Sequence, residues 1–283
     1  MPPNWQDPQG DPDADHYSKA SKPAWKATMP DMTITPPLFT PATPNKMHTD
    51  TQKMLTYNFD KYMHDILAAI SDAWDQWQMM ASMAGIMVMG PVATLGQLVG
   101  PPLMPLILKN TALLATPDLA KFTKVIATVI SNSWMQFTAT VKIPGLPFWP
   151  AFTMVTLPVA PPMPNTPVPF ATLMQVPVSI SAEMMKQQMV MQLGDPNAPF
   201  ASQLFASICD AFEKAYDLWK VATMVSNVMG TGPVPTFAPP YVPGGPVVGG
   251  TGMMAPGGLT GKAPDMPPLP MPPEWNPPQG EIS

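Results

Sequence analysis

The longest helical pattern in the chain runs from Thr49 to Met89. Apolar residues recur there at steps of three or four, which places them on one helical face. These residues are Leu55, Phe59, Tyr62, Ile66, Ala69, Ala73 and Trp77. After Asp75 the segment is apolar all round, as in a helix end buried on every side. The sequence Gly90-Pro91 is expected to stop the helix, because proline has no amide proton and disfavours helical geometry at the preceding residue.

Three further segments have helical patterns. The first follows Thr116, which is a suitable cap, and Pro117, which suits the first helical position. Its apolar face is formed by Leu119, Phe122, Ile126, Val129, Ile130, Ser133 and Phe137. The other two span about Ser181–Leu193 and Phe200–Val228, and the sequence Gly230-Thr-Gly-Pro ends the last one. The sequence therefore predicts about four helices.

Two short segments have the alternating, β-branched pattern of strands. They span about Gln136–Ile143 and Ala151–Val159. Together they predict a small β-hairpin near residues 136–159, whose loop would display Phe148 and Trp149. Pro158 would confine the second strand to an edge or place it at the strand's end.

Proline dominates the rest of the chain, with 42 prolines among 283 residues. This density interrupts helices and excludes central strands. We therefore expect an extended arm over residues 1–47, a helical core with proline-rich insertions over 48–229, and a second Pro/Gly-rich arm over 230–283. The predicted fold is mainly α with long extended arms, irregular and non-globular.

Aromatic residues are spaced along both predicted arms, where they could anchor the arm in a partner. These partner-anchoring candidates are Trp5 and Trp25 in the first arm, Phe237, Tyr241 and Trp275 in the second, and Phe148 and Trp149 in the predicted loop. The alternative, an unstructured tail with incidental aromatic residues, stays open for both arms.

The distribution of charge is uneven. The net charge is −5 and all 14 basic residues are lysine, so a nucleic-acid partner is not expected. Three stretches carry no charge at all, namely Gln76–Leu108, Ile143–Ala182 and Val221–Gly261. Long uncharged stretches are poor solvated surface, so we expect them to be buried within the fold or against neighbouring subunits.

The sequence offers no catalytic, cofactor-binding or metal-binding residues. The three histidines are scattered, and no phosphate-loop, dinucleotide, nucleophile-elbow or zinc-protease motif occurs. The single cysteine, Cys209, lies on a predicted helix face and is interpreted as a buried structural thiol. The 26 methionines could supply soft ligands to Cu(I), but packing in a core or an interface is the preferred interpretation. An enzyme is not expected.

The uncharged segment 79–108 leaves a second interpretation open. Its first part, Met79–Gly100, is long enough to cross a bilayer. However, glycine and proline interrupt it at Gly85, Gly90 and Pro91, and the flanking positive charge is weak. A membrane-active protein that uses this segment is the alternative function, although a membrane partner is not the main expectation.

The segment Met229–Gly252, with the sequence MGTGPVPTFAPPYVPGGPVVGGTG, resembles the tails of minor structural proteins of tailed bacteriophage particles. The aromatic arms and the small helical core resemble such proteins in style. The resemblance implies a non-enzymatic part of the tail, baseplate or capsid, whose arms lace neighbouring subunits together. Its partners would be other virion proteins and copies of itself, in a virion assembled in the host cytoplasm. A secreted protein with proline-rich display stays open as another interpretation.

Overall fold

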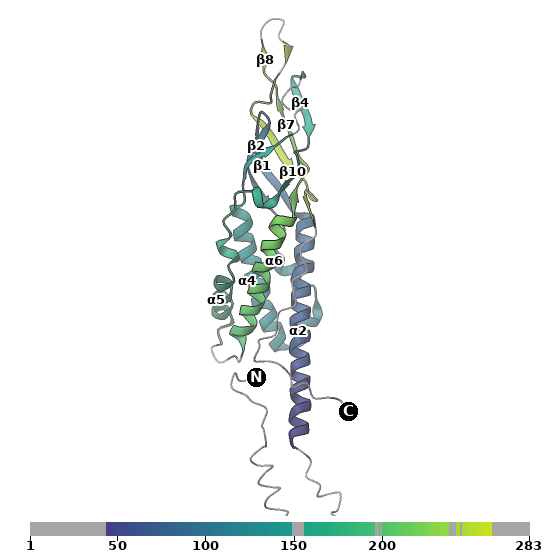
Figure 1. Cartoon of the computed structure of the whole chain (residues 1–283), viewed down its shortest axis with the longest axis vertical. Coiled ribbons are helices and arrows are strands. Elements are labelled where there is room, and N and C mark those ends of the chain that lie inside the picture. The colour runs from purple at the N-terminus through teal and green to yellow at the C-terminus, as the bar shows by residue number, and fades with distance from the viewer. Residues whose placement is uncertain are drawn as a thin grey trace, which may run out of the picture. The chain divides into compact units, whose positions relative to one another are not determined.

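The computed structural model describes residues 44–148, 156–195, 198, 200–237, 242–243 and 245–261 (Figure 1). The chain divides into two compact units, Met1–Met63 with Pro270–Ser283, and His64–Leu269. In the described residues, five α-helices accompany a six-stranded sheet and a three-stranded sheet, both antiparallel. The expectation of a mainly α, irregular protein is therefore wrong. Many segments that were interpreted as extended connections pair with one another as strands.

The helix α2 (Pro44–Met80) has the predicted apolar stripe from Tyr62 onward. Tyr62, Ile66 and Trp77 are buried, and so are the two alanines between them on the same face. Phe59, at the start of the stripe, is exposed. The helix ends at Met80 rather than continuing to Met89.

The residues after α2 form a β-hairpin instead of a buried helix end. The strands β1 (Ser82–Met89) and β2 (Val92–Val99) pair in antiparallel fashion across the two-residue loop Gly90-Pro91. Gly90 has a φ of 63°, the positive value that the first loop position of a type II′ turn requires. Most residues along the second half of β1 alternate between buried and exposed. The methionine-rich run therefore has the period of a strand.

The helix α4 (Pro117–Thr140) begins as predicted. The Thr116 hydroxyl oxygen accepts a hydrogen bond from the backbone N–H of Leu119 at 3.2 Å. Asp118 lies in the first turn, where its negative charge interacts favourably with the helix dipole. The predicted cap is confirmed.

The predicted strand over 136–143 is wrong, because α4 continues as far as Thr140. The Thr138 and Thr140 hydroxyls donate hydrogen bonds at 3.0 and 2.7 Å to backbone carbonyls three residues earlier. Such back-bonding lets a helix accommodate β-branched residues that would otherwise favour a strand.

The predicted hairpin near 136–159 is also wrong for the described residues, whereas residues 149–155, in its loop and second strand, lie outside them. The strand β3 (Ile143–Pro147) pairs with β2, whereas β4 (Val159–Met163) pairs with a strand from the predicted C-terminal arm. Consequently β3 and β4 are the two outermost strands of the six-stranded sheet. The six strands follow one another in space as β3, β2, β1, β10 (Gly250–Met254), β7 (Val228–Pro233) and β4.

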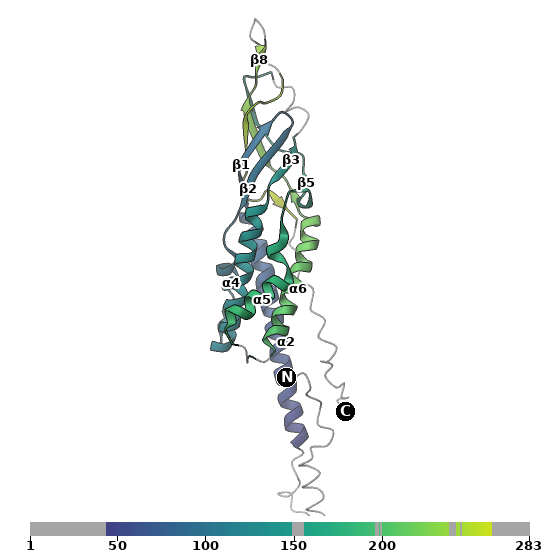
Figure 2. The same ribbon diagram turned by 90° about the vertical axis from the view of Figure 1, so that its left-hand side faces the viewer.

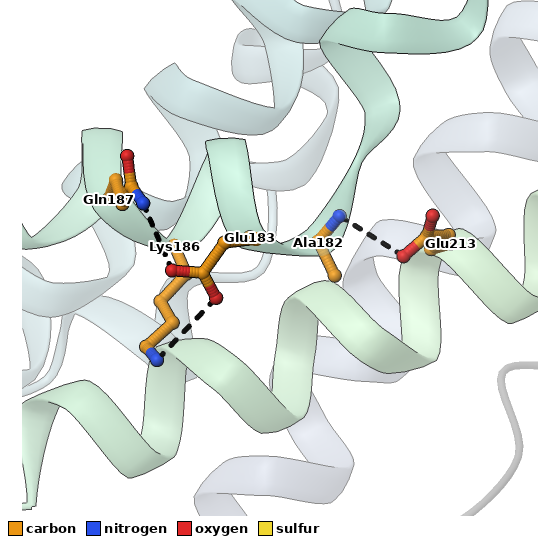
Figure 3. Close-up of polar contacts among 5 residues, drawn as sticks. All are labelled: Ala182, Glu183, Lys186, Gln187 and Glu213. Atoms are coloured by element: carbon orange, nitrogen blue, oxygen red, sulfur yellow. Dashed lines mark hydrogen bonds and ion pairs between the residues drawn. The ribbon is translucent and has the colours of Figure 1, made fainter.

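The helices α5 (Ala182–Leu193) and α6 (Ala201–Ala222) pack against each other in antiparallel orientation. The carboxylate of Glu213 on α6 accepts a hydrogen bond at 3.1 Å from the backbone N–H of Ala182, at the start of α5 (Figure 3). The first turn of α5 is held further by Glu183, which pairs with Lys186 at 3.8 Å and accepts a hydrogen bond from Gln187 at 3.0 Å. The predicted helix over 200–228 ends earlier, at Ala222.

Shorter elements connect the helices and the six-stranded sheet. The three-stranded sheet has the order β11 (Leu259–Thr260), β6 (Met224–Val225) and β5 (Val168–Pro169), and a separate pair is formed by β8 (Thr236–Phe237) and β9 (Val242–Pro243). The short helices are α3 (Leu103–Ile107), η2 (Thr111–Leu114), η4 (Phe170–Thr172) and η5 (Pro177–Ile180). Among the described residues, no helix has both the length and the apolar character needed to cross a bilayer.

Four tryptophans form the centre of the helical core, and each is almost completely buried. They come from three helices: Trp74 and Trp77 from α2, Trp134 from α4 and Trp219 from α6. The centroid of the Trp134 ring lies 4.8 Å from that of Trp74, 4.9 Å from that of Trp77 and 5.6 Å from that of Trp219. The ring planes meet at 63°, 86° and 68°. Such edge-to-face pairs add stabilisation beyond the area that each ring buries. Within residues 64–269, the helices gather at one end of the six-stranded sheet (Figures 1 and 2).

Candidate functional site: an uncharged sheet surface

The three uncharged stretches of the sequence meet in one structural element. Gln76–Leu108 supplies β1 and β2, Ile143–Ala182 supplies β3 and β4, and Val221–Gly261 supplies β7 and β10. These are the six strands of the large sheet. The sheet consequently contains no charged residue, although its strands come from parts of the chain more than 150 positions apart.

The inner face of this sheet packs against itself. Phe148, which follows β3, is buried, and its ring lies so close to Gly230 on β7 that a Cβ atom there would be 2.7 Å from the ring. Beyond the ends of the outermost strands, Phe148 also forms an antiparallel bridge with Asn165. Ile86 and Val88 of β1 are buried between these edges. The sheet is therefore curled, and the apolar side chains of its inner face are enclosed.

The outer face presents two rows of side chains across the central strands. In one row, Met87 of β1 lies between Thr94 of β2 and Thr251 of β10, and Thr251 lies opposite Thr231 of β7. In the other row, Met253 of β10 lies opposite Met229 of β7. We call these residues the methionine face: Met87, Thr94, Met229, Thr231, Thr251 and Met253.

The methionine face is accessible and apolar. The side chain of Met253 is 61% exposed, and Met87 and Met229 are also exposed. Several apolar residues outside the face extend the exposed surface along the same sheet, namely Met89, Val92, Leu95, Val99 and Val159. Groups of exposed apolar side chains on one surface are often interaction sites.

Charge is confined to the helices and their connections in the described part of the chain. Ion pairs join Lys220 with Asp217 at 2.5 Å on α6, and Lys121 of α4 with Asp195 at 3.8 Å. The charged residue next to the sheet in sequence is Lys142, directly before β3. The chain is thus divided into a charged helical part and an uncharged sheet.

The sulfur atoms of Cys209 and Met189 lie 3.7 Å apart in the interface between α6 and α5. Burial, together with the neighbouring carboxylates of Asp210 and Glu213, raises the pKa of the Cys209 thiol to about 12. A thiol in this state is protonated at neutral pH and is a poor nucleophile and metal ligand. Among the described residues, no cluster of three or more histidine, cysteine or acidic side chains could hold a metal ion.

A hollow of about 580 Å³ lies where α4 ends and β3 begins. Its lining consists of Ala139, Thr140, Lys142, Met174, Gln175 and Val176. Lys142 is the only ionisable side chain in this lining, so the hollow lacks the paired groups that acid–base catalysis needs. Its chemistry gives no basis for a catalytic site.

The structure describes the side chain of only one of the predicted anchoring residues. Trp5, Trp25, Trp149, Tyr241 and Trp275 lie outside the described residues, and for Phe237 only the backbone, in β8, is described. Phe148 is 5% exposed and is packed inside its own chain. It is therefore not displayed on a loop as the sequence suggested.

The sequence did not identify Met87, Met229 and Met253 as surface residues. Buried and exposed positions alternate around Met87 with a period of two, but residues of both kinds are apolar there, so the sequence carries no polar/apolar alternation. Glycine and proline interrupt the neighbouring strands and hide the same alternation there. The cross-strand rows depend on pairing between distant segments, which the sequence does not reveal.

The chain was compared with protein families, curated proteins and solved structures. No family model matches it, and no curated protein or solved structure shows significant similarity to it.

Proposed function

We propose that this protein is a non-enzymatic structural component of a large assembly, the virion of a tailed bacteriophage. Its partners there are other virion proteins and copies of itself. The observation that carries the proposal is the convergence of three uncharged stretches into one sheet with an exposed methionine face. A surface of this kind is stabilised when another subunit removes it from water.

The composition of the sheet supports a structural role rather than recognition of a charged ligand. An uncharged face offers no partner to a phosphate, a carboxylate or an ammonium group, and desolvating such a group there would be unfavourable. Methionine has a flexible and polarizable side chain that adapts to irregular apolar surfaces. The face therefore suits a protein surface of similar, uncharged character.

The segments outside the described part of the chain add to the proposal. Residues 1–43 precede α2, and a chain of that length can reach at most roughly 155 Å when fully extended. They contain the anchoring candidates Trp5 and Trp25, whose large rings contribute strongly to interfaces. An arm of this reach would connect subunits beyond immediate neighbours.

A mass-spectrometric inventory of purified phage particles tests the proposal. Peptides of this chain should copurify with the particles through a density gradient, at a constant ratio to the other structural proteins. The same gradient fractions from uninfected host cells serve as the control. If the chain is absent from the particles, or if it sediments with added lipid vesicles instead, the proposal is wrong.

A further inference from the structure

We propose that the C-terminal segment of the chain, residues 262–283, docks on the first half of its own helix α2. Four exposed side chains, Met54, Tyr57, Asn58 and Lys61, are spaced at steps of three and four on this half of the helix, so they lie on one side of it. We call them the α2 surface. A helix in a protein gains most of its stability from the packing of one face, so a ligand that covers the α2 surface stabilises this half of α2.

The segment begins beside α2. The last described residue before it is Gly261, and the Gln78 side chain near the end of α2 donates hydrogen bonds to the carbonyls of Gly261 and Leu259. Residues 262–283 are therefore tethered to the helix that they are proposed to contact. Such a tether gives a segment a high effective concentration at its binding site.

The length of the tether matches the distance along the helix. Tyr57 lies 21 positions before Gln78 on α2, which is roughly 32 Å at the helical rise of 1.5 Å per residue. In polyproline II conformation, residues 262–271 span roughly 31 Å from Gly261 at 3.1 Å per residue. The middle of residues 267–273 thus comes level with Tyr57.

The chemistry of residues 267–273 suits the α2 surface. This run has the sequence PPLPMPP, with five prolines and no charge. A polyproline II chain has no internal hydrogen bonds, so its carbonyls are free to accept them. The Tyr57 hydroxyl, the Asn58 amide and the Lys61 ammonium are donors, and proline-rich segments dock on aromatic rings such as that of Tyr57.

The N-terminal segment, residues 1–43, is the competing occupant of the α2 surface. Residues 270–283 belong to the same compact unit as the first half of α2, as do residues 1–43. However, no seven-residue stretch of 1–43 has more than three prolines. The density of proline therefore favours the C-terminal segment.

The inference goes beyond the proposed function and does not rest on it, because it concerns a contact within the free chain. In an assembly, this segment reaches a neighbouring subunit only by leaving the α2 surface. A contact within the chain therefore competes with contacts between subunits. Absence of the chain from phage particles would overturn the proposed function and leave the inference unaffected.

Photo-cross-linking of the full chain at low concentration identifies what covers the α2 surface. A Lys61→Cys variant carries one reactive thiol, because Cys209 is buried, and this thiol is labelled with a benzophenone maleimide. In a mixture of ¹⁴N and ¹⁵N chains, products should join the label to residues 267–275 of the same chain. Products joined to residues 1–43, mixed-isotope products, or products without residues 267–275 would overturn the proposal.

Limited proteolysis measures the docking without a label. The protease Glu-C cuts after Glu274, next to the docked run, and this cut should be at least about tenfold slower in the wild type than in Tyr57→Ala, because proteolysis follows the population of the open form. Cleavage after Glu281, beyond the run, should be equal in both chains. Tyr57 is 66% exposed, so circular dichroism should show unchanged folding in the variant.

Met191→Ala is the matched control, because Met191 is 73% exposed on α5. This variant should be cut after Glu274 as slowly as the wild type. If Tyr57→Ala leaves the rate of this cut unchanged, or if Met191→Ala raises it equally, the C-terminal segment is not held by the α2 surface and the proposal is wrong.

Discussion

Methionine occupies two opposite environments in this protein. On α5, Met185 and Met189 are completely buried and fill the interface with α6. On the six-stranded sheet, Met87 and Met253 are exposed on a face that has no charge. The residue type therefore serves both as core filler and as adaptable surface. Buried methionines therefore contribute to packing between helices, and exposed methionines offer apolar surface for association.

Cys209 should be unreactive in the folded protein. Burial raises the pKa of its thiol to about 12, and only the thiolate reacts quickly with disulfide reagents. Ellman's reagent at pH 8 should therefore label the native chain far more slowly than the chain unfolded in urea. Labelling at equal rates in the two states would show that the α5–α6 interface is open.

Alkaline pH should destabilise the fold through the same residue. In the unfolded chain the Cys209 thiol loses its proton near its usual pKa of 9.0, whereas the folded chain holds the proton until about pH 12. The unfolded state binds fewer protons between these values, so the free energy of unfolding falls as the pH rises. The urea midpoint should drop above pH 9, and it should drop less in Cys209→Ala. An identical pH dependence in both chains would contradict this account.

Close backbone approach limits the residue type at Gly232. A Cβ atom there would lie 2.4 Å from the Cα atom of Gly250 on the neighbouring strand. Gly232→Ala should therefore force the strands apart and cost about 1–3 kcal/mol of unfolding free energy, measured by urea denaturation. The control is Gly145→Ala in β3, where nothing lies within 4 Å of the added atom. Equal stability of the two variants would show that β7 and β10 are not packed as described.

At the scale of single elements, helices could be predicted and strand pairing could not. The stripe of α2 and the cap of α4 follow from local spacing, which a sequence displays directly. The hairpin β1–β2 was missed because Gly90-Pro91 was interpreted only as a helix stop, although glycine followed by any residue also forms a type II′ turn. The partner of β1 on its other side, β10, lies far away in sequence. Such long-range pairing leaves no local pattern.

Only part of the candidate surface could be predicted, because local composition is visible in the sequence and strand pairing is not. The three uncharged stretches, and the need to cover them, are visible in the sequence. Their meeting in one sheet depends on pairings such as β1 with β10 and β4 with β7. Phe148 shows the limit of reasoning from residue type, because its apparently displayed ring packs beside Gly230.

Gln78 joins three elements and should be important for stability. Its side-chain oxygen accepts a hydrogen bond from the indole N–H of Trp219 on α6 at 2.7 Å. Its side-chain nitrogen donates to the carbonyls of Leu259, in β11, and Gly261. Gln78→Leu would leave these buried groups without a partner and should cost about 1–3 kcal/mol.

Thermal and urea unfolding measure the effect of Gln78→Leu. The control is Gln136→Leu, an exposed position on α4, which should change the unfolding free energy by less than about 0.5 kcal/mol. If both variants unfold at the wild-type midpoint, the hydrogen bonds of Gln78 do not hold α2, α6 and β11 together.

At the scale of the whole molecule, the charged helices and the uncharged sheet have different roles in the proposed function. The helices, with their core of four tryptophans, supply internal stability. In the proposed function, the sheet presents the methionine face to a partner, and residues 1–43 and 262–283 provide further chain for contacts between subunits. Assembly defects and folding defects should therefore arise from different residues.

The terminal aromatic residues should affect assembly without affecting folding. The double variant Trp5→Ala with Trp25→Ala removes two large rings from the N-terminal segment, and such rings often dominate interface energies. Its incorporation into particles should fall strongly, while its thermal midpoint stays unchanged. Lys19→Ala with Lys26→Ala, in the same segment, should incorporate normally. If the double tryptophan variant incorporates like the wild type, Trp5 and Trp25 do not anchor the N-terminal segment in the particle.

Oxidation of methionine tests most directly whether the methionine face is covered in the assembly. The free chain at low concentration and the intact particle are treated with dilute hydrogen peroxide, and methionine sulfoxide is measured at each position by mass spectrometry. Met87, Met229 and Met253 should be oxidised in the free chain and protected in the particle. Met191 on α5 should be oxidised at similar rates in both. Equal oxidation of the methionine face in the particle and in the free chain would show that no subunit covers the sheet.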